Sequence, residues 1–324
     1  MRNIRLFILK IAAMAGAALT LLTSCANHPK WNTAEGEVMR DLAYGEGPRN
    51  RYDLYLPACE KPKALMLFIH GGSWIGGEKE DMAWAAERYA KEGYITASIN
   101  YTRLGGDPLG YESKYERACM QTMLEEIHSS IGAIKAQCKA LGCNIRQMSI
   151  GGYSAGGHLT MLYSTLYASK SPIPIKFQIS WVGPSDFNLL FPTPPNFDIK
   201  GAAPENESRI FYANMHNFIY GISGEHLTEE TTHEQIHSYK SKVSPCDLVT
   251  TQTPPAVLAY GGQDRLVNAI HGEKMVEVLD AAGVENCYIL FPNSGHGLES
   301  DPDASESLQA AILQFCDKYF CGKK

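Results

Sequence analysis

The sequence predicts an α/β fold: a doubly wound, mostly parallel central sheet with helices on both faces and an inserted cap region. Short apolar runs alternate with longer helical patterns over most of the 324 residues. This alternation is typical of parallel strands joined by crossover helices. The rhythm stops between about residues 184 and 253, where prolines and aromatic residues are frequent and no clean strand is present. We interpret that stretch as a cap inserted into the main domain.

The ordered part of the chain is expected to begin with a hairpin. Residues 38–44 and 51–56 are β-prone, and the segment 45–48 between them has the glycine and proline residues of a turn. The following strands are continuous apolar runs, as expected for strands covered on both faces. We expect them at 65–69, 95–99, 147–150, 177–182, 256–260 and 287–291, with helices at about 81–92, 113–140, 155–168, 268–282 and 305–319.

Composition excludes several classes of function. Hydrophobic residues make up 44% of the chain and charged residues 20%, which is typical of a globular protein with a large core. The net charge of −6 leaves no basic footprint for nucleic acid, so no nucleic-acid partner is expected. Internal repeats and low-complexity tracts are absent from the sequence.

The N-terminus has the pattern of an export signal. Arg2, Arg5 and Lys10 precede an uncharged apolar run at 11–22, which is too short to span a bilayer. The run ends in Leu-Thr-Ser-Cys at 22–25, and this sequence resembles the bacterial lipobox, where cleavage precedes a cysteine that then carries lipid. An ordinary secretory peptide is the alternative, and it predicts export as well.

These features divide the chain into three parts. We expect a lipoprotein-type signal peptide at 1–24, a short polar tether at 25–36 and a single α/β domain at 37–324, with its cap at about 184–253. Lipidation of Cys25 would anchor the protein to a membrane of the bacterial cell envelope, on the periplasmic or the surface side. The sequence contains no signal that indicates an oligomeric state.

Eight cysteines remain when Cys25 is set aside. Export permits disulfides, and the pairs Cys138/Cys143 and Cys316/Cys321 are near enough in sequence to be candidates. A chain of this size does not need disulfides for stability, so reduced, buried cysteines are equally consistent with the sequence.

Residues 150–160 carry the strongest catalytic signal. Gly152-x-Ser154-x-Gly156 has the pattern of a nucleophile elbow, in which a strand turns sharply into a helix and exposes a serine. An apolar run precedes the glycines and good helix formers follow them. The glycines allow the strand and the helix to approach closely, and the new helix directs its free N–H groups toward whatever Ser154 attacks. We therefore predict that Ser154 is a nucleophile.

A nucleophilic serine needs a base and an orienting acid, which in this architecture follow in the order Ser, Asp or Glu, His at the carboxyl ends of strands. Asp264 follows the strand expected at 256–260, and His296 follows the strand expected at 287–291. We predict that these residues complete a triad with the serine. Among the competing acids, Asp186 precedes the cap, whereas Asp301 and Asp303 follow the histidine, which is the wrong order.

The segment His-Gly-Gly-Ser-Trp at 70–74 follows the strand expected at 65–69 and is close to the HGGG loop that offers backbone N–H groups to an oxyanion. We predict that the N–H groups of Gly72, Ser73 and Ala155 form the oxyanion hole. Trp74 and Phe187 are candidate substrate-binding residues, because they adjoin this loop and the exit of a neighbouring strand. His70 is expected to fix the loop's shape.

Together these motifs resemble the esterase/lipase branch of the α/β-hydrolase superfamily. The resemblance runs from about residue 51 to residue 320 and is greatest to hormone-sensitive-lipase-like enzymes and to bacterial carbohydrate or feruloyl esterases with HGG(G/S)W loops. It implies an α/β-hydrolase fold and ester hydrolysis through a covalent acyl-serine, without a cofactor. Ser73 and the long cap are departures from the family pattern.

We therefore predict a serine carboxylic-ester hydrolase that removes small acyl or aryl groups, such as acetyl or feruloyl groups, from carbohydrates. The expected partner is a small-molecule or glycan ester. A serine peptidase or amidase and a kynurenine-formamidase-like hydrolase use the same triad and remain alternatives. A non-catalytic glycan-binding lipoprotein is a third alternative from a different class.

The cap contains His-Glu-Gln-Ile-His at 233–237, which matches the zinc-protease motif H-E-x-x-H. Zinc hydrolysis would need a third ligand, and His226 or His216 would have to supply it from the N-terminal side. The segment is polar and follows a helix start at 228–230, so we interpret it as a solvated cap helix and expect no metal.

Overall fold

The computed structural model describes residues 36–59, 61–104, 119–193, 223–225, 228 and 230–320. The predicted signal peptide and the predicted tether lie outside the described residues, except for Gly36. Cys25, His216, His226 and Cys321 lie outside them as well. Among the described residues, no helix combines the length and the apolar character needed to cross a membrane.

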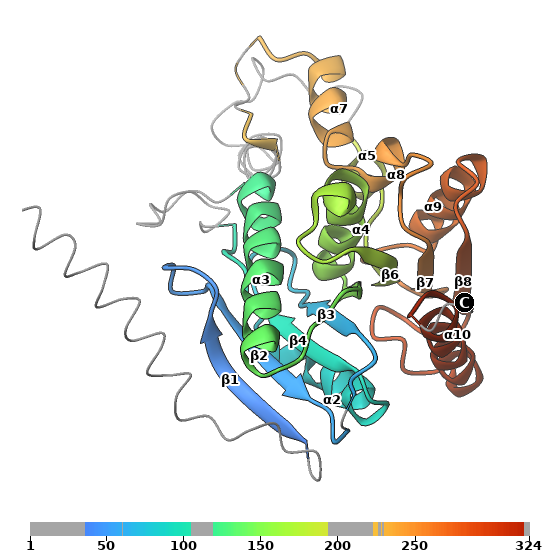
Figure 1. Cartoon of the computed structure of the whole chain (residues 1–324). Coiled ribbons are helices and arrows are strands. Elements are labelled where there is room, and N and C mark those ends of the chain that lie inside the picture. Colours follow the sequence, from blue (N-terminus) through green and yellow to red (C-terminus); the bar gives the residue numbers. More distant parts are fainter. Residues whose placement is uncertain are drawn as a thin grey trace, which may run out of the picture.

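The described chain forms the predicted sheet, and the fold class is confirmed. Eight strands lie in the order β1-β2-β4-β3-β5-β6-β7-β8 (Figure 1). The β1–β2 and β2–β4 pairs are antiparallel, and every other neighbouring pair is parallel. The strands are β1 Glu37–Ala43, β2 Arg51–Leu56, β3 Leu65–Ile69, β4 Ile95–Ile99, β5 Met148–Tyr153, β6 Ile175–Trp181, β7 Ala256–Gly261 and β8 Asn286–Phe291.

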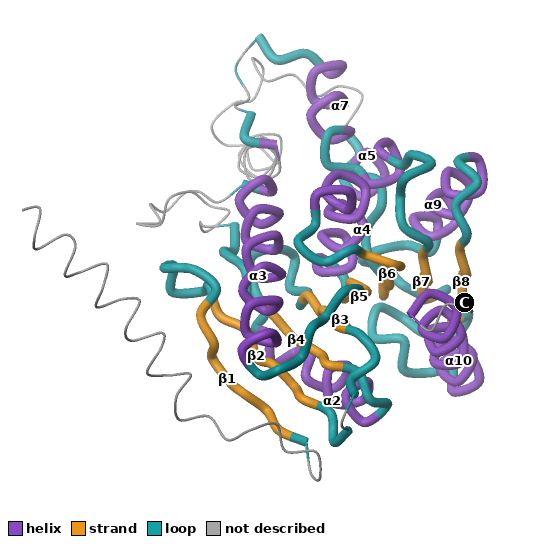
Figure 2. Tube along the Cα trace, in the orientation of Figure 1, coloured by secondary structure: helices purple, strands orange, loops and turns teal. Residues whose placement is uncertain are grey.

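Helices cover both faces of this sheet (Figure 2). In β3, Leu65, Leu67 and Ile69 pack in one core with α3 and α4, whereas Met66 and Phe68 pack in a second core with α2 and α10. A third core joins β7 to α9. The helices are η1 Lys79–Met82, α2 Ala83–Lys91, α3 Met120–Ala140, α4 Ala155–Tyr167, η2 Ala168–Lys170, α5 Phe187–Leu190, α7 His233–Ser241, α8 Pro245–Leu248, α9 Ile270–Ala281 and α10 Pro302–Phe320.

Several predicted boundaries differ from the structure. The strand expected to end at residue 150 runs on through two glycines to Tyr153. The helix expected at 81–92 is the short helix η1 followed by α2. The helix in the second half of the cap begins after Thr232, later than expected, because the side chains of Thr232 and Gln235 cap each other's backbone N–H groups.

Cys138 and Cys143 both carry reduced thiols in the structure. Burial raises the pKa of the Cys138 thiol to about 12, so this side chain behaves as a small apolar group. The sequence left a disulfide and reduced cysteines open for this pair, and the structure has the reduced form. The other candidate pair includes Cys321, which lies outside the described residues.

A buried lysine connects the two ends of the cap that the structure describes. Lys240 in α7 is only 1% exposed. Its ammonium group donates to the carbonyl of Phe191 and to Thr193 Oγ1, the latter at 2.8 Å. Burial lowers the pKa of Lys240 from its ordinary 10.5 to about 8, because a charged group is costly in a poorly solvated site.

This lowered pKa makes stability depend on pH. Between pH 8 and 10.5 the unfolded chain keeps a proton on Lys240 that the folded chain has released, so stability must rise with pH in that window. We expect the free energy of unfolding of wild type, relative to Lys240→Met, to increase by roughly 2–3 kcal/mol from pH 7 to pH 10. Urea unfolding at each pH measures this difference. Lys242→Met, an exposed neighbour in sequence, is the control, and an equal pH dependence in both variants would contradict the assignment.

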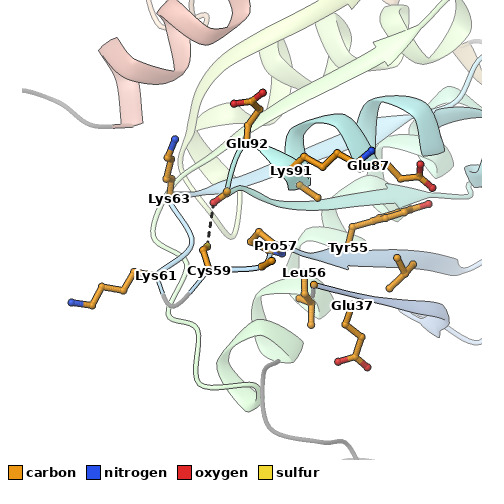
Figure 3. A pocket seen from close by; sticks show the side chains of 15 residues that line it. Glu37, Tyr55, Leu56, Pro57, Cys59, Lys61, Lys63, Glu87, Lys91 and Glu92 are labelled. Atoms are coloured by element: carbon orange, nitrogen blue, oxygen red, sulfur yellow. Dashed lines mark hydrogen bonds between the residues drawn. The ribbon is translucent and has the colours of Figure 1, made fainter. Parts of the chain in front are cut away.

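The sheet has two opposite ends along the direction of its strands. The parallel strands end at one of them, where the predicted site residues lie. At the other end, beside the start of β1, a hollow of about 680 Å³ is lined by residues that include Tyr55, Cys59, Lys63 and Lys91 (Figure 3). Its three lysines are matched by three glutamates, and none of the predicted site residues borders it.

Candidate active site

Ser154 occupies a sharp turn between β5 and α4. Its backbone angles are φ 53° and ψ −118°. Residues other than glycine rarely adopt this conformation, which stores strain. The flanking glycines are required by space. A Cβ on Gly152 would lie 2.2 Å from the Gly156 carbonyl oxygen, and a Cβ on Gly156 would lie 2.1 Å from the carbonyl oxygen of Ile69. Strand and helix therefore hold the serine hydroxyl in one position.

The structure brings the three predicted triad side chains into one hydrogen-bonded line. His296 Nε2 lies 2.9 Å from Ser154 Oγ, and His296 Nδ1 lies 2.7 Å from Asp264 Oδ2. An ionised aspartate accepts hydrogen bonds and cannot donate them, so the proton between Asp264 and His296 belongs to Nδ1. Nε2 is then left to accept the serine proton. The three residues come from the ends of β5, β7 and β8.

Asp264 is held as a buried, ionised carboxylate. Its side chain is fully shielded from solvent, and the other carboxylate oxygen accepts the backbone N–H groups of Leu266 at 2.8 Å and Val267 at 3.0 Å. Burial alone would raise the pKa of Asp264. The hydrogen bonds from His296, Val267 and Leu266 outweigh burial, so the pKa lies below its ordinary value.

Two of the competing acids, Asp186 and Asp301, have other partners. Asp186 caps α5 and forms an ion pair with Lys274. Asp301 accepts hydrogen bonds from Asn293 and Ser294, so it shapes the loop that carries His296 without contacting the imidazole. Asp264 is the acid that reaches His296.

The loop at 70–74 turns through three consecutive residues with positive φ, at Gly72 (101°), Ser73 (51°) and Trp74 (63°). The carbonyl of Gly72 accepts the N–H groups of Ile75 and Gly76. Within the described chain, no hydrogen bond uses the N–H groups of Gly72, Ser73 or Ala155. A serine at the position of the usual third glycine thus adopts the left-handed conformation and keeps its donor available.

These elements surround a cleft of about 410 Å³. Its walls come from the loop at 70–74, from η1 and the start of α2, and from the loops after β5, β7 and β8. The described residues that line it are Gly71, Gly72, Ser73, Asp81, Met82, Trp84, Tyr153, Ser154, Leu266 and His296.

A protein-family model, BD-FAE, matches residues 52–279 of the chain, which is more than half of its length. The chain belongs to the BD-FAE family. This is an α/β-hydrolase esterase family, and the match includes the elbow, the loop at 70–74 and Asp264.

Other comparisons agree with this BD-FAE assignment. An isoprenylcysteine alpha-carbonyl methylesterase of Arabidopsis thaliana is 23% identical over 262 residues, covering 80% of this chain and 56% of the relative. Two further plant relatives of this kind are covered to 65% and 51% of their length. The chain thus spans between half and two thirds of these relatives.

Solved structures show the same fold. Esterase B from Lactobacillus rhamnosis has a TM-score of 0.63 and 16% identity, with 97% of this chain and 96% of that chain covered. A truncated carbohydrate esterase from gut microbiota has a TM-score of 0.62 and 18% identity, with 89% and 99% covered.

Trp74 and Phe187, predicted to bind substrate, do not line the cleft of this BD-FAE protein. Trp74 is 3% exposed and Phe187 is fully buried, and their rings pack against each other at 5.3 Å. The prediction is corrected on this point. The positive φ of Trp74 turns its indole away from the cleft and into the core beside α4.

Sequence reasoning missed two residues that hold the site together. His158, on α4, accepts the Trp74 indole N–H at Nδ1 (3.2 Å), and its Nε2 lies 2.8 Å from the Val243 carbonyl at the base of the cap. Burial lowers the pKa of His158 to about 4, so the ring stays neutral. Tyr153 donates its hydroxyl to the His296 carbonyl. The histidine in the Ser-Ala-Gly-Gly-His sequence was a visible signal for the first.

The Trp74–His158 bond is expected to support the strained loop. Trp74→Phe keeps an aromatic ring but leaves His158 Nδ1 without its donor, so we expect stability to fall by about 1–3 kcal/mol and kcat for p-nitrophenyl acetate to fall about tenfold. KM should change little, because the loop's donors act in the transition state. Thermal unfolding and steady-state kinetics measure both effects. A variant with lowered stability and wild-type kcat would show that the bond supports only the fold.

Two other histidine predictions can be located. His70 is buried and stacks on Tyr101 at 4.3 Å, and burial lowers its pKa to about 4, which suits a role in loop shape. His233 and His237 lie on exposed turns of α7. Among the residues that the structure describes, no group of three or more metal-ligating side chains is present.

Proposed function

We propose that the protein is a serine carboxylic-ester hydrolase that works through an acyl-enzyme. His296 Nε2 accepts the Ser154 proton as Oγ attacks the ester carbonyl carbon. The carbonyl oxygen then carries negative charge, which the N–H groups of Gly72, Ser73 and Ala155 stabilise. His296 passes its proton to the leaving alcohol oxygen as the C–O bond breaks. Water, deprotonated by His296, then releases the acid and restores the serine.

The observation that carries this proposal is the continuous hydrogen-bonded line from Ser154 through His296 to the ionised Asp264. Asp264 stabilises the imidazolium that forms in both half-reactions and holds the required tautomer. Family membership supports an ester as the substrate.

For the substrate we propose acyl esters of carbohydrates, with acetyl or feruloyl as the acyl group. The described cleft has a volume of about 410 Å³, and its lining sets the carboxylate of Asp81 beside the apolar side chains of Trp84 and Leu266, which suits a small acyl group on a polar alcohol. The structural likeness to a carbohydrate esterase from gut microbiota supports the same class.

We also propose that the protein is exported and anchored through lipid on Cys25, as the sequence at 22–25 suggests. In a bacterium grown with a radiolabelled fatty acid, the wild-type protein should carry the label and Cys25→Ser should not. Wild type without the label, or equal labelling of both proteins, would contradict lipidation of Cys25.

A fluorophosphonate probe tests the catalytic proposal directly. We expect covalent labelling of Ser154, located by peptide mass spectrometry, together with hydrolysis of p-nitrophenyl acetate. A panel of acetyl, butyryl, octanoyl and feruloyl esters, with a peptide amide and N-formylkynurenine beside them, ranks the substrate classes. Faster turnover of the peptide or the formamide would replace the esterase proposal, and absence of labelling would favour a non-catalytic protein.

A further inference from the structure

One wall of the cleft carries an exposed tryptophan. Trp84, at the start of α2, lines the cleft and is 46% exposed. Its ring meets the buried Trp181 edge-on, with centroids 5.5 Å apart and an interplanar angle of 73°. The contact with Trp181 therefore positions the indole, and nearly half of the Trp84 side chain stays exposed.

Two side chains on the same wall, Asp81 and Trp84, have hydrogen-bonding atoms to spare. Asp81, three residues before Trp84, lines the cleft, and one of its carboxylate oxygens accepts the Glu78 N–H at 2.9 Å. In the part of the chain that the structure describes, no hydrogen bond uses its other oxygen or the Trp84 indole N–H. The wall thus offers an exposed indole ring, one donor and one charged acceptor.

We propose that Trp84 and Asp81 form the subsite for the sugar ring of an acylated carbohydrate. This inference rests on the proposed esterase function. A pyranose ring has a face of C–H bonds that can lie on an indole, and hydroxyl groups around its rim that can donate to a carboxylate. Because Trp84, Asp81 and Ser154 border one cleft, a ring bound there brings its ester to the nucleophile.

The Asp81 carboxylate distinguishes a sugar from an acyl group as the occupant of the subsite. An apolar acyl chain or an aryl ring seated on Trp84 would shield Asp81 from water with few donors to replace it, which is costly for a charged group. A sugar supplies several hydroxyl donors. The geometry therefore favours the alcohol part of the substrate over the acyl part.

Kinetics on three esters test the subsite: a monoacetylated methyl xyloside, p-nitrophenyl acetate and methyl ferulate. Trp84→Ala should lower kcat/KM for the acetyl xyloside by about tenfold to a hundredfold, and at least tenfold more than for p-nitrophenyl acetate. Asp81→Asn, which can still accept the Glu78 N–H, should lower kcat/KM for the acetyl xyloside about tenfold. Trp84→Phe keeps a stacking ring and should fall between wild type and Trp84→Ala.

Two variants outside the cleft serve as controls, Leu166→Ala for the loss of an exposed apolar side chain and Asp303→Asn for the loss of an exposed charge. Equal losses for all three esters in Trp84→Ala would overturn the sugar subsite, as would a loss confined to methyl ferulate. Wild type that hydrolyses p-nitrophenyl acetate but not the acetyl xyloside overturns it too, and leaves the esterase proposal standing. Wild type inactive on every ester, with Ser154 unlabelled, refutes the proposed function itself.

Discussion

Replacing Ser154 with alanine is expected to lower kcat for p-nitrophenyl acetate by about 10⁴–10⁶-fold. No other described side chain that lines the cleft places a hydroxyl within hydrogen-bonding distance of His296 Nε2. The acyl-enzyme therefore cannot form, and only the oxyanion donors and substrate binding remain. Steady-state kinetics and fluorophosphonate labelling measure the loss.

The control for this substitution is Ser305→Ala, which removes an exposed serine hydroxyl from α10 at a distance from the cleft residues. Its activity should match wild type. Ser154→Ala should also keep the wild-type fold, because alanine can adopt the same backbone conformation as serine. A folded Ser154→Ala variant that retained more than a few per cent of activity would remove Ser154 from the mechanism.

Asp264→Asn is expected to lower kcat by roughly 10³–10⁴-fold. The asparagine side chain fits the same space and can keep its oxygen on the Leu266 and Val267 N–H groups. Its amide group then faces His296 Nδ1 as a donor, which favours the tautomer that carries its proton on Nε2. That tautomer cannot accept a proton from Ser154.

A matched comparison is Asp301→Asn, since Asp301 shapes the His296 loop without touching the imidazole. Its effect should be mainly on stability, measured by thermal unfolding, with a much smaller effect on kcat. If both variants lost activity equally, the loop rather than the carboxylate would explain the effect, and Asp264 would lose its assigned role.

The meeting of Ser154, His296 and Asp264 is predictable from the sequence for a geometric reason. Each residue follows an apolar run, and the carboxyl ends of parallel strands share one edge of the sheet. Chain order then selects Asp264 among the aspartates, without any knowledge of side-chain contacts.

The end of β5 is not predictable in the same way. Glycine weakens an isolated strand, so the pattern suggests an end at residue 150. In the structure a Cβ on Gly151 would lie 3.1 Å from Trp181 and 3.3 Å from Phe68. The glycine is there because two aromatic residues from neighbouring strands fill its space, and such a requirement depends on tertiary contacts.

The direction of Trp74 shows a similar limit. Proximity in sequence to an oxyanion loop does not reveal which way a side chain points, because this loop turns through three successive residues with positive φ. Trp84 illustrates the opposite case. It lies on a helix with no catalytic motif, and only the fold brings it to the cleft.

The first described strand starts beside Leu56, at the edge where the parallel strands begin. A strand of five or six residues spans about 17–20 Å, so the start of β1 and the residues of the cleft lie at opposite ends of the parallel strands. The proposed lipid on Cys25 would therefore be attached to the domain at the end of the strands away from Ser154, and the attachment point itself takes up none of the space beside the nucleophile.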